Sequence, residues 1–171
     1  MDEAIQLAIE MSETNWHNFK NDLKDLTPGE IDWRPLPQGN NVNVLMKHLR
    51  VVEELMLSRL EHGEQSPYKD AAGVQKLTDS VPLNCEQNMK ELDGFHTRFI
   101  SALQSTTLAE LKRQSFLTPF AQGPQPASTL LLAEISHLAM HRGQIRTIRN
   151  LYRKARGEPA LFLPQNPMFG E

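Results

Sequence analysis

The chain has 171 residues, of which 39% are hydrophobic and 23% are charged. This composition is typical of a globular protein and excludes both a disordered chain and a membrane-embedded one. A net charge of −3 argues against a nucleic-acid-binding surface, which normally carries a clustered basic excess. The length suits one domain, residues 1–171, built around a single core.

Apolar residues that alternate at spacings of three and four predict four long amphipathic helices. These helices cover about residues 2–26, 42–61, 82–104 and 127–155. In the first, the predicted buried stripe comprises Ile5, Ile9, Ser12, Trp16, Phe19, Leu23 and Leu26. Four helices with one apolar face each can bury those faces against one another, which predicts an all-α four-helix bundle.

Residues with capping chemistry mark the predicted helix ends. Asn41 or Asn43 can cap the second helix. The pair Asp79-Ser80 can cap the third, and Pro82 suits its first turn. Gly157 follows the fourth helix as a stop signal.

The connections are expected to be irregular. Prolines and a glycine make residues 27–41 a loop, in which Trp33 either plugs the end of the core or lines a substrate mouth. Residues 62–79 show no convincing periodicity and are predicted to be a long connection. The second helix spans roughly 30 Å, and a connection at up to about 3.3 Å per residue can return along all of it. The second and third helices can therefore be parallel.

The C-terminal third adds smaller elements. Residues 106–113 predict a short extra helix, and residues 114–126 a loop. The tail, residues 156–171, is predicted to be extended, with hydrophobic residues that dock on the bundle or on a second subunit. A basic cluster is interpreted as a solvated helix end, where cations favour the helix dipole, and an anion site is the alternative. The cluster comprises Arg146, Arg149, Arg153, Lys154 and Arg156.

The compartment is predicted from what the sequence lacks. A single cysteine, Cys85, excludes an internal disulfide and fits a reducing environment. The N-terminus is acidic and shows no signal peptide. No apolar stretch approaches the roughly 20 residues that span a bilayer. We expect a cytoplasmic protein that binds neither membrane nor nucleic acid.

Three histidines fall on predicted buried faces and indicate a metal site. His137 and His141 lie four residues apart, one turn apart on one helix face, and His48 lies on the apolar face of the second helix. Three neutral imidazoles on facing helices can hold one divalent ion and leave coordination positions open, as in a catalytic site. The alternative is three core histidines, each with its own hydrogen-bond partner.

Other polar residues are candidates for smaller roles. Glu134 could orient a ligand, act as a fourth ligand or be a plain helix carboxylate. His96 faces the predicted seam and is a further candidate to touch the site. His17 and His62 are interpreted as surface or boundary histidines. No general acid or base is identified, and the catalytic residues remain unknown.

Three motifs, in order, resemble the DinB/YfiT-like superfamily of metal-binding four-helix bundles. They are Trp33-Arg34-Pro35 with Pro37, Val44-Leu45-Met46-Lys47-His48-Leu49, and His137-Leu138-Ala139-Met140-His141-Arg142-Gly143-Gln144-Ile145. The resemblance covers about residues 1–153. It implies an up-down-down-up bundle, which agrees with the long 62–79 connection, and one divalent ion held by His48, His137 and His141.

The resemblance also implies a set of possible functions. Nickel and zinc are the metals expected first, with iron or manganese as alternatives. Some relatives are thiol-dependent S-transferases or isomerases that use bacillithiol, mycothiol or glutathione, and homodimers are common. We expect a thiol S-transferase that acts on a small-molecule thiol and an electrophile. The alternatives are a metal-dependent hydrolase and a non-catalytic, stress-related metal-binding or protein-interaction bundle. Gly143 could permit close helix approach in the core or at a dimer contact.

Overall fold

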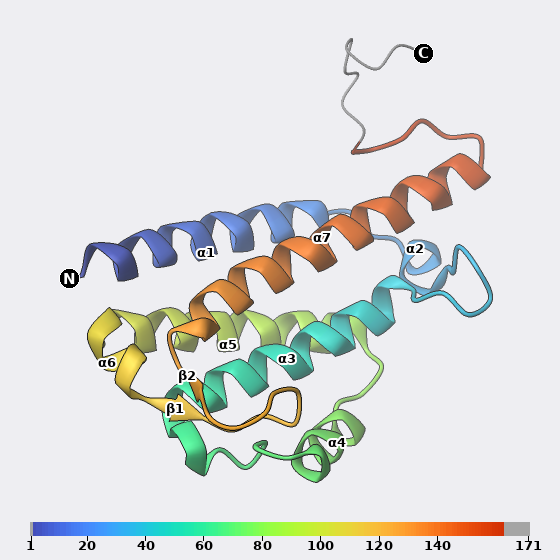
Figure 1. Ribbon diagram of the computed structural model, residues 1–171. Helices are drawn as coiled ribbons and strands as arrows, with labels where there is room; N and C mark the ends of the chain where they lie inside the picture. Colours follow the sequence, from blue (N-terminus) through green and yellow to red (C-terminus); the bar gives the residue numbers. More distant parts are fainter. Residues whose placement is uncertain (1, 163–171) are drawn as a thin grey trace.

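The computed structural model describes residues 2–162. Four long helices form the main part of the fold (Figure 1). These are α1 (Glu3–Asp22), α3 (Val42–His62), α5 (Cys85–Gln104) and α7 (Thr129–Ala155). Figure 1 shows α1 and α7 running in one direction and α3 and α5 in the other. The predicted all-α bundle with up-down-down-up order and a crossover between the second and third long helices is confirmed.

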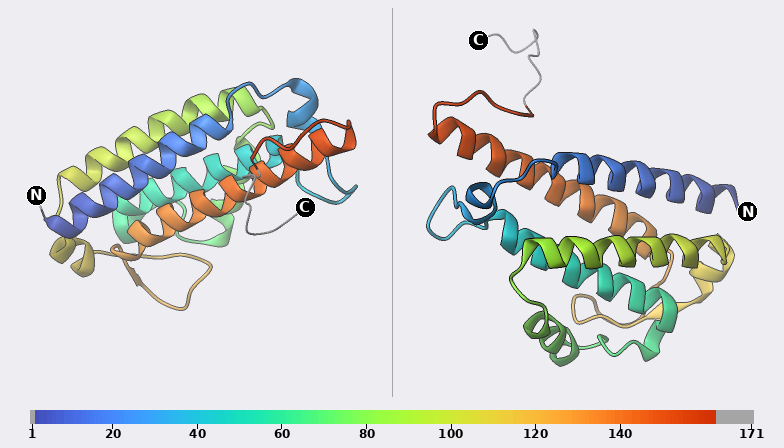
Figure 2. Two further views of the ribbon diagram at one scale, coloured as in Figure 1. Left: turned by 90° about the horizontal axis from the view of Figure 1, so that it is seen from above. Right: turned by 180° about the vertical axis from the view of Figure 1, so that it is seen from behind.

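The four helices lie side by side in an elongated bundle (Figure 2), and their buried apolar residues form two main clusters, with a third between α3 and α4 (Ala71–Ser80). Helix α3 packs against α5 and α7, while α1 packs against α7 and α5. The stripe predicted for α1 is buried from Ile5 to Phe19. Each large apolar side chain buried in this way stabilises the fold by about 1.5–3 kcal/mol. None of the helices in residues 2–162 combines the length and apolarity needed to cross a membrane.

Short elements occupy the connections, and the prediction that these segments are irregular was partly wrong. They are α2 (Pro28–Asp32), η1 (Gly63–Gln65), α4 (Ala71–Ser80), α6 (Leu108–Arg113), β1 (Ser115–Phe116) and β2 (Gln125–Pro126). The two strands pair antiparallel, and α6 matches the predicted extra helix. Helix α2 forms because Thr27 and Glu30 make a reciprocal capping box around Pro28.

Helix α4 and the start of α5 were the clearest errors in the element boundaries. Helix α4 packs Leu77 against Val51 and Leu55 of α3, a long-range contact that its own periodicity did not reveal. Because α4 extends through Ser80, helix α5 begins later than predicted, and Asn84 caps it by accepting a hydrogen bond from the Gln87 amide. The predicted cap at Asp79-Ser80 was therefore wrong.

The predicted start of α3 and end of α7 are confirmed, whereas α1 ends at Asp22, before the predicted residue 26. The Asn41 side chain accepts a hydrogen bond of 2.9 Å from the Val44 amide at the start of α3. Gly157 follows the end of α7 with φ of 73°, a conformation that favours glycine. Trp33 is half-buried against the core and meets Tyr152 edge to face, as the core-plug interpretation predicted.

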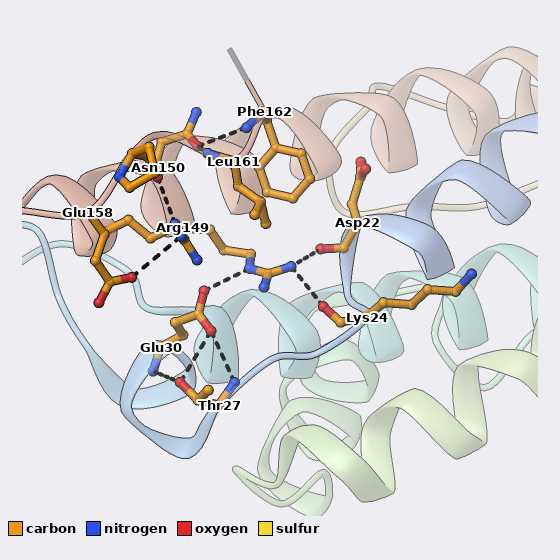
Figure 3. A network of polar contacts seen from close by, with 11 residues as sticks. Asp22, Lys24, Thr27, Glu30, Arg149, Asn150, Glu158, Leu161 and Phe162 are labelled. Atoms are coloured by element: carbon orange, nitrogen blue, oxygen red, sulfur yellow. Dashed lines mark hydrogen bonds and ion pairs between the residues drawn. The ribbon is translucent and has the colours of Figure 1, made fainter. Parts of the chain in front are cut away.

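The basic cluster is only partly a solvated helix end, which corrects the interpretation for its inner members. Arg149 is 2% exposed; its Nε donates to Glu30 Oε1 at 2.9 Å, and its Nη1 donates to the Asp22 carbonyl at 2.6 Å (Figure 3). Arg146 pairs with the Asp22 carboxylate. These acidic partners come from α1 and α2, so only the tertiary structure brings them to α7.

The beginning of the tail packs on this network. The amides of Leu161 and Phe162 donate to Asn150 Oδ1 at 2.8 and 3.1 Å (Figure 3). The guanidinium groups of Arg146 and Arg149 lie 5.0 and 5.4 Å from the centre of the Phe162 ring, within the range of cation–π attraction. Docking of the tail on the bundle is confirmed here, while the prediction for residues 163–171 lies outside the described residues.

Candidate metal centre

The three predicted histidines meet between α3 and α7. His137 Nε2 lies 3.1 Å from His48 Nε2 and 3.0 Å from His141 Nε2. All three ligand atoms lie within 4.8 Å of one another. The predicted convergence of these rings is confirmed, and it brings together positions that are 89 residues apart in the chain.

Local helix geometry explains the placement. His137 and His141 are one turn apart on α7, so both rings project to the same side. Helices α3 and α7 are neighbours in the bundle, and His48 lies on the α3 face that turns to α7. His48 is exposed, His137 is intermediate and His141 is buried, which places the cluster at the boundary between core and solvent.

The electrostatics keep the three rings neutral near neutral pH. Burial, together with smaller contributions from the neighbouring His141 and His48, lowers the pKa of His137 to about 3. Burial also lowers the pKa of His48, with a contribution from His141, and the pKa of His141 itself. A metal ion requires unprotonated imidazole nitrogens, and this cluster supplies them.

The hydrogen-bond partners fit a metal-binding role better than three separate core histidines. His141 Nδ1 lies 2.7 Å from Gln144 Oε1, so this nitrogen donates and Nε2 is left with its lone pair. His137 Nδ1 is buried without a partner, and the three Nε2 atoms point at one another. A hydrogen bond between two of these Nε2 atoms needs a proton on one of them, so such bonds cannot use all three lone pairs. One cation can accept all three lone pairs at once. The residues therefore fit a divalent ion.

The group holds three nitrogens and, among the described residues, no carboxylate or thiolate. Three protein ligands leave coordination positions open, which is the arrangement of catalytic rather than structural zinc sites. A cavity of about 510 Å³ adjoins the centre, with His48 and His137 in its wall. The rest of that wall is mainly apolar and comes from α3, α4, α7 and the segment after β1.

Glu134 and His96 belong to a different cluster inside the bundle. Ser12 Oγ donates to Glu134 Oε1 at 2.9 Å, and His96 Nδ1 lies 3.8 Å from the same oxygen. Burial raises the pKa of Glu134 to about 7. Burial and the Glu134 carboxylate raise the pKa of Glu53 well above its ordinary range. Burial therefore favours the protonated form of both carboxyl groups.

These contacts correct the predicted roles of the two residues. Within the described chain, Glu134 makes no hydrogen bond to His48, His137 or His141, so it is neither a fourth ligand nor an orienting group. His96 stacks on Trp16 at 4.7 Å between ring centres and lies outside the histidine cluster. Both residues face α1 instead of the centre.

The positions of the other residues considered in the sequence decide their roles. His17 and His62 are exposed, as predicted. A Cβ atom on Gly143 would meet nothing within 4 Å, so close helix approach in the core was the wrong explanation, and a dimer contact stays a prediction. Gln144 was missed, although its spacing of three residues from His141 on one helix was a usable signal.

Comparisons with known proteins agree with this architecture. The DinB superfamily profile matches residues 11–145. A crystal structure of a conserved protein from Enterococcus faecalis is 20% identical, with a TM-score of 0.65 over 90% of this chain and 99% of that one. A DinB-like protein from Bacillus cereus is 19% identical, with a TM-score of 0.62 over 91% and 95% of the two chains. No curated protein matches.

At this level of identity the two crystal structures show a common fold and nothing further. The family profile carries more weight because it spans most of the chain and includes His48, His137 and His141. The chain belongs to the DinB superfamily.

Proposed function

We propose that this protein is a metal-dependent enzyme in which His48, His137 and His141 hold one divalent ion. The observation that carries the proposal is the convergence of three Nε2 atoms beside a cavity of about 510 Å³, with no other protein ligand in the group among residues 2–162. A purely structural site would normally close its coordination with a fourth protein ligand. Imidazole ligands suit nickel, zinc or iron, and manganese is a further alternative.

The chemistry would be activation of a nucleophile. A divalent ion lowers the pKa of a coordinated thiol or water toward neutrality and polarises the bound group. The chain itself supplies neutral imidazoles, a fixed His141 orientation through Gln144, and apolar walls that exclude water. A thiol or water whose pKa is lowered toward neutrality would release its proton to solvent, so the scheme requires no carboxylate as general base, and the histidine cluster contains none among the described residues.

Thiol transfer to a small electrophile is the first candidate reaction, and it is supported by membership in the DinB superfamily. Hydrolysis, with water in place of the thiol, is the second candidate because the same centre serves either nucleophile. A homodimer is expected, as is common in the superfamily. A stress-related binding protein without turnover is the competing proposal, and absence of activity in the assays below would favour it.

Metal content tests the site directly. Protein purified without chelators or a histidine tag should contain about one nickel or zinc ion per chain by elemental analysis. Simultaneous replacement of His48, His137 and His141 by alanine should abolish this content. Replacement of the exposed His62 by alanine is the matched control and should leave it unchanged. Full metal occupancy in the triple variant would refute the assignment.

Turnover separates the enzyme from a binding protein. Metal-loaded protein is mixed with bacillithiol, mycothiol or glutathione and a chromogenic aryl halide, and with activated esters in a parallel series. Conjugation that is lost on metal removal and restored by reloading supports thiol transfer. Metal-dependent ester cleavage without conjugation supports the hydrolase. A protein that binds metal but is inactive in both series contradicts the proposal of an enzyme.

A further inference from the structure

The cavity beside the metal centre has two chemically different ends. His48 and His137 lie at one end, and Arg59, near the C-terminus of α3, lies at the other. Arg59 follows His48 by about three helical turns, or roughly 16 Å along the axis. The wall between them is apolar and includes Val52, Leu55, Met56, Phe116, Leu130 and Ala133.

Arg59 is buried without an anionic partner. The residue is 7% exposed, and in the described part of the chain no carboxylate lies within ion-pair distance of it. Its Nη2 donates to Thr118 Oγ1 at 3.2 Å, and its guanidinium lies 5.4 Å from the centre of the Phe116 ring. Its Nε is buried and has no hydrogen-bond partner. Arg149, by contrast, is equally buried but pairs with Glu30.

The surroundings explain only part of this arrangement. The last turn of a helix favours a cation, and the Phe116 ring offers cation–π attraction. Neither one gives the Nε–H an acceptor. A buried charge without a counter-ion is costly, so an anion that enters the cavity would gain both an ion pair and a hydrogen bond. Guanidinium groups present two N–H donors in a plane that matches a carboxylate.

We propose that the cavity binds a molecule with an apolar body and a carboxylate, with the carboxylate at Arg59 and the opposite end directed to the three histidines. This inference rests on the proposed function in that the bound molecule is the substrate of the metal centre. A helical side chain leans toward the N-terminus of its helix, so the Arg59 side chain is inclined toward His48. The mainly apolar wall disfavours a strongly polar electrophile in this cavity, and Arg59 sets the orientation of the electrophile that binds.

Calorimetric titration with octanoate and octanol tests the proposal, because the two probes share a chain and differ in charge. Octanoate should bind at least about tenfold more tightly, as expected for a charge-assisted hydrogen bond. Arg59→Met keeps an apolar side chain of similar length and should remove this preference, while Arg59→Lys should retain part of it. Arg113→Met, at an exposed arginine outside the cavity, is the control and should match the wild type.

The metal state separates this proposal from the proposed function. The preference for octanoate should persist in chelator-treated protein. If the preference for octanoate over octanol disappears when the metal is removed but survives in Arg59→Met, the carboxylate binds the ion, and the proposal is overturned. Equal binding of both probes to the wild type would overturn it as well, whether or not the variants fold. A protein that binds no metal yet shows the Arg59-dependent preference would refute the metal centre and leave the carboxylate site standing.

Discussion

Replacement of Glu134 by glutamine tests whether the core carboxyl group is protonated in the folded protein. Glu134 is 1% exposed and lies 3.8 Å from His96, so the two side chains form either an ion pair or a neutral pair. Burial raises the pKa of Glu134 and lowers the pKa of His96. The proton is therefore expected on the carboxyl group, which glutamine mimics in shape and in lack of charge.

The pKa of Glu134 gives the sign and size of the effect. The folded protein holds this proton with a pKa of about 7, against an ordinary value of 4.5. Its contribution to stability is complete below pH 4.5 and is lost as the pH rises through 7. The difference between these two pKa values means that the wild type loses about 3 kcal/mol of unfolding free energy by pH 8, relative to its stability below pH 4.5. Glu134→Gln should therefore stay within about 1 kcal/mol of the wild type at pH 5 and be more stable by about 3 kcal/mol at pH 8.

Urea unfolding followed by circular dichroism measures this difference. Both proteins are unfolded at pH 5 and pH 8 in the presence of a chelator, so that metal binding does not contribute. The exposed Glu10→Gln serves as the control and should show no pH-dependent gain. A Glu134→Gln variant that is less stable than the wild type at pH 8 would show that Glu134 is ionised and paired with a charged His96, which would refute the reasoning.

Three further replacements test other parts of the structure. Arg149→Met leaves the Glu30 carboxylate buried without its cation and should lower the unfolding free energy in urea by about 3–5 kcal/mol. Asn41→Ala removes the cap of α3 and should lower it by about 1 kcal/mol. Gln144→Ala releases the His141 ring and should weaken metal binding by about 10–100-fold in a competition assay with a chromogenic chelator.

Each replacement has a control on the same element or at the same position. Lys154→Met lies on an exposed part of α7 and should change stability by less than about 0.5 kcal/mol; an equal loss in both variants would contradict the buried pair. Asn41→Asp keeps the accepting oxygen and should preserve most of the stability. Gln144→Glu also keeps an acceptor for His141 and should retain the metal affinity that Gln144→Ala loses. Unchanged affinity in Gln144→Ala would remove Gln144 from the site.

The four long helices and the three histidines could be predicted from the sequence because both follow from helical periodicity. A stripe with spacings of three and four predicts which face of a helix is buried. His141 is buried as predicted, whereas His137 is intermediate and His48 is exposed, so the predicted burial of His48 was wrong. The same rule placed His96 on a buried face, as the structure confirms. It gave no information on which buried faces meet, and His96 meets α1 rather than the histidine cluster.

Only the tertiary structure decided the partners of the charged residues. Glu134 and Arg149 look alike in the sequence, as single charges on α7, yet one accepts a hydrogen bond from Ser12 and the other pairs with Glu30. Arg59 sits in an apolar stripe, and only the packing of α7 and the segment after β1 leaves it without an anionic partner among the residues that the structure describes. Periodicity is a property of one helix, whereas burial of a charge and the identity of its partner depend on two or more elements that only folding brings together.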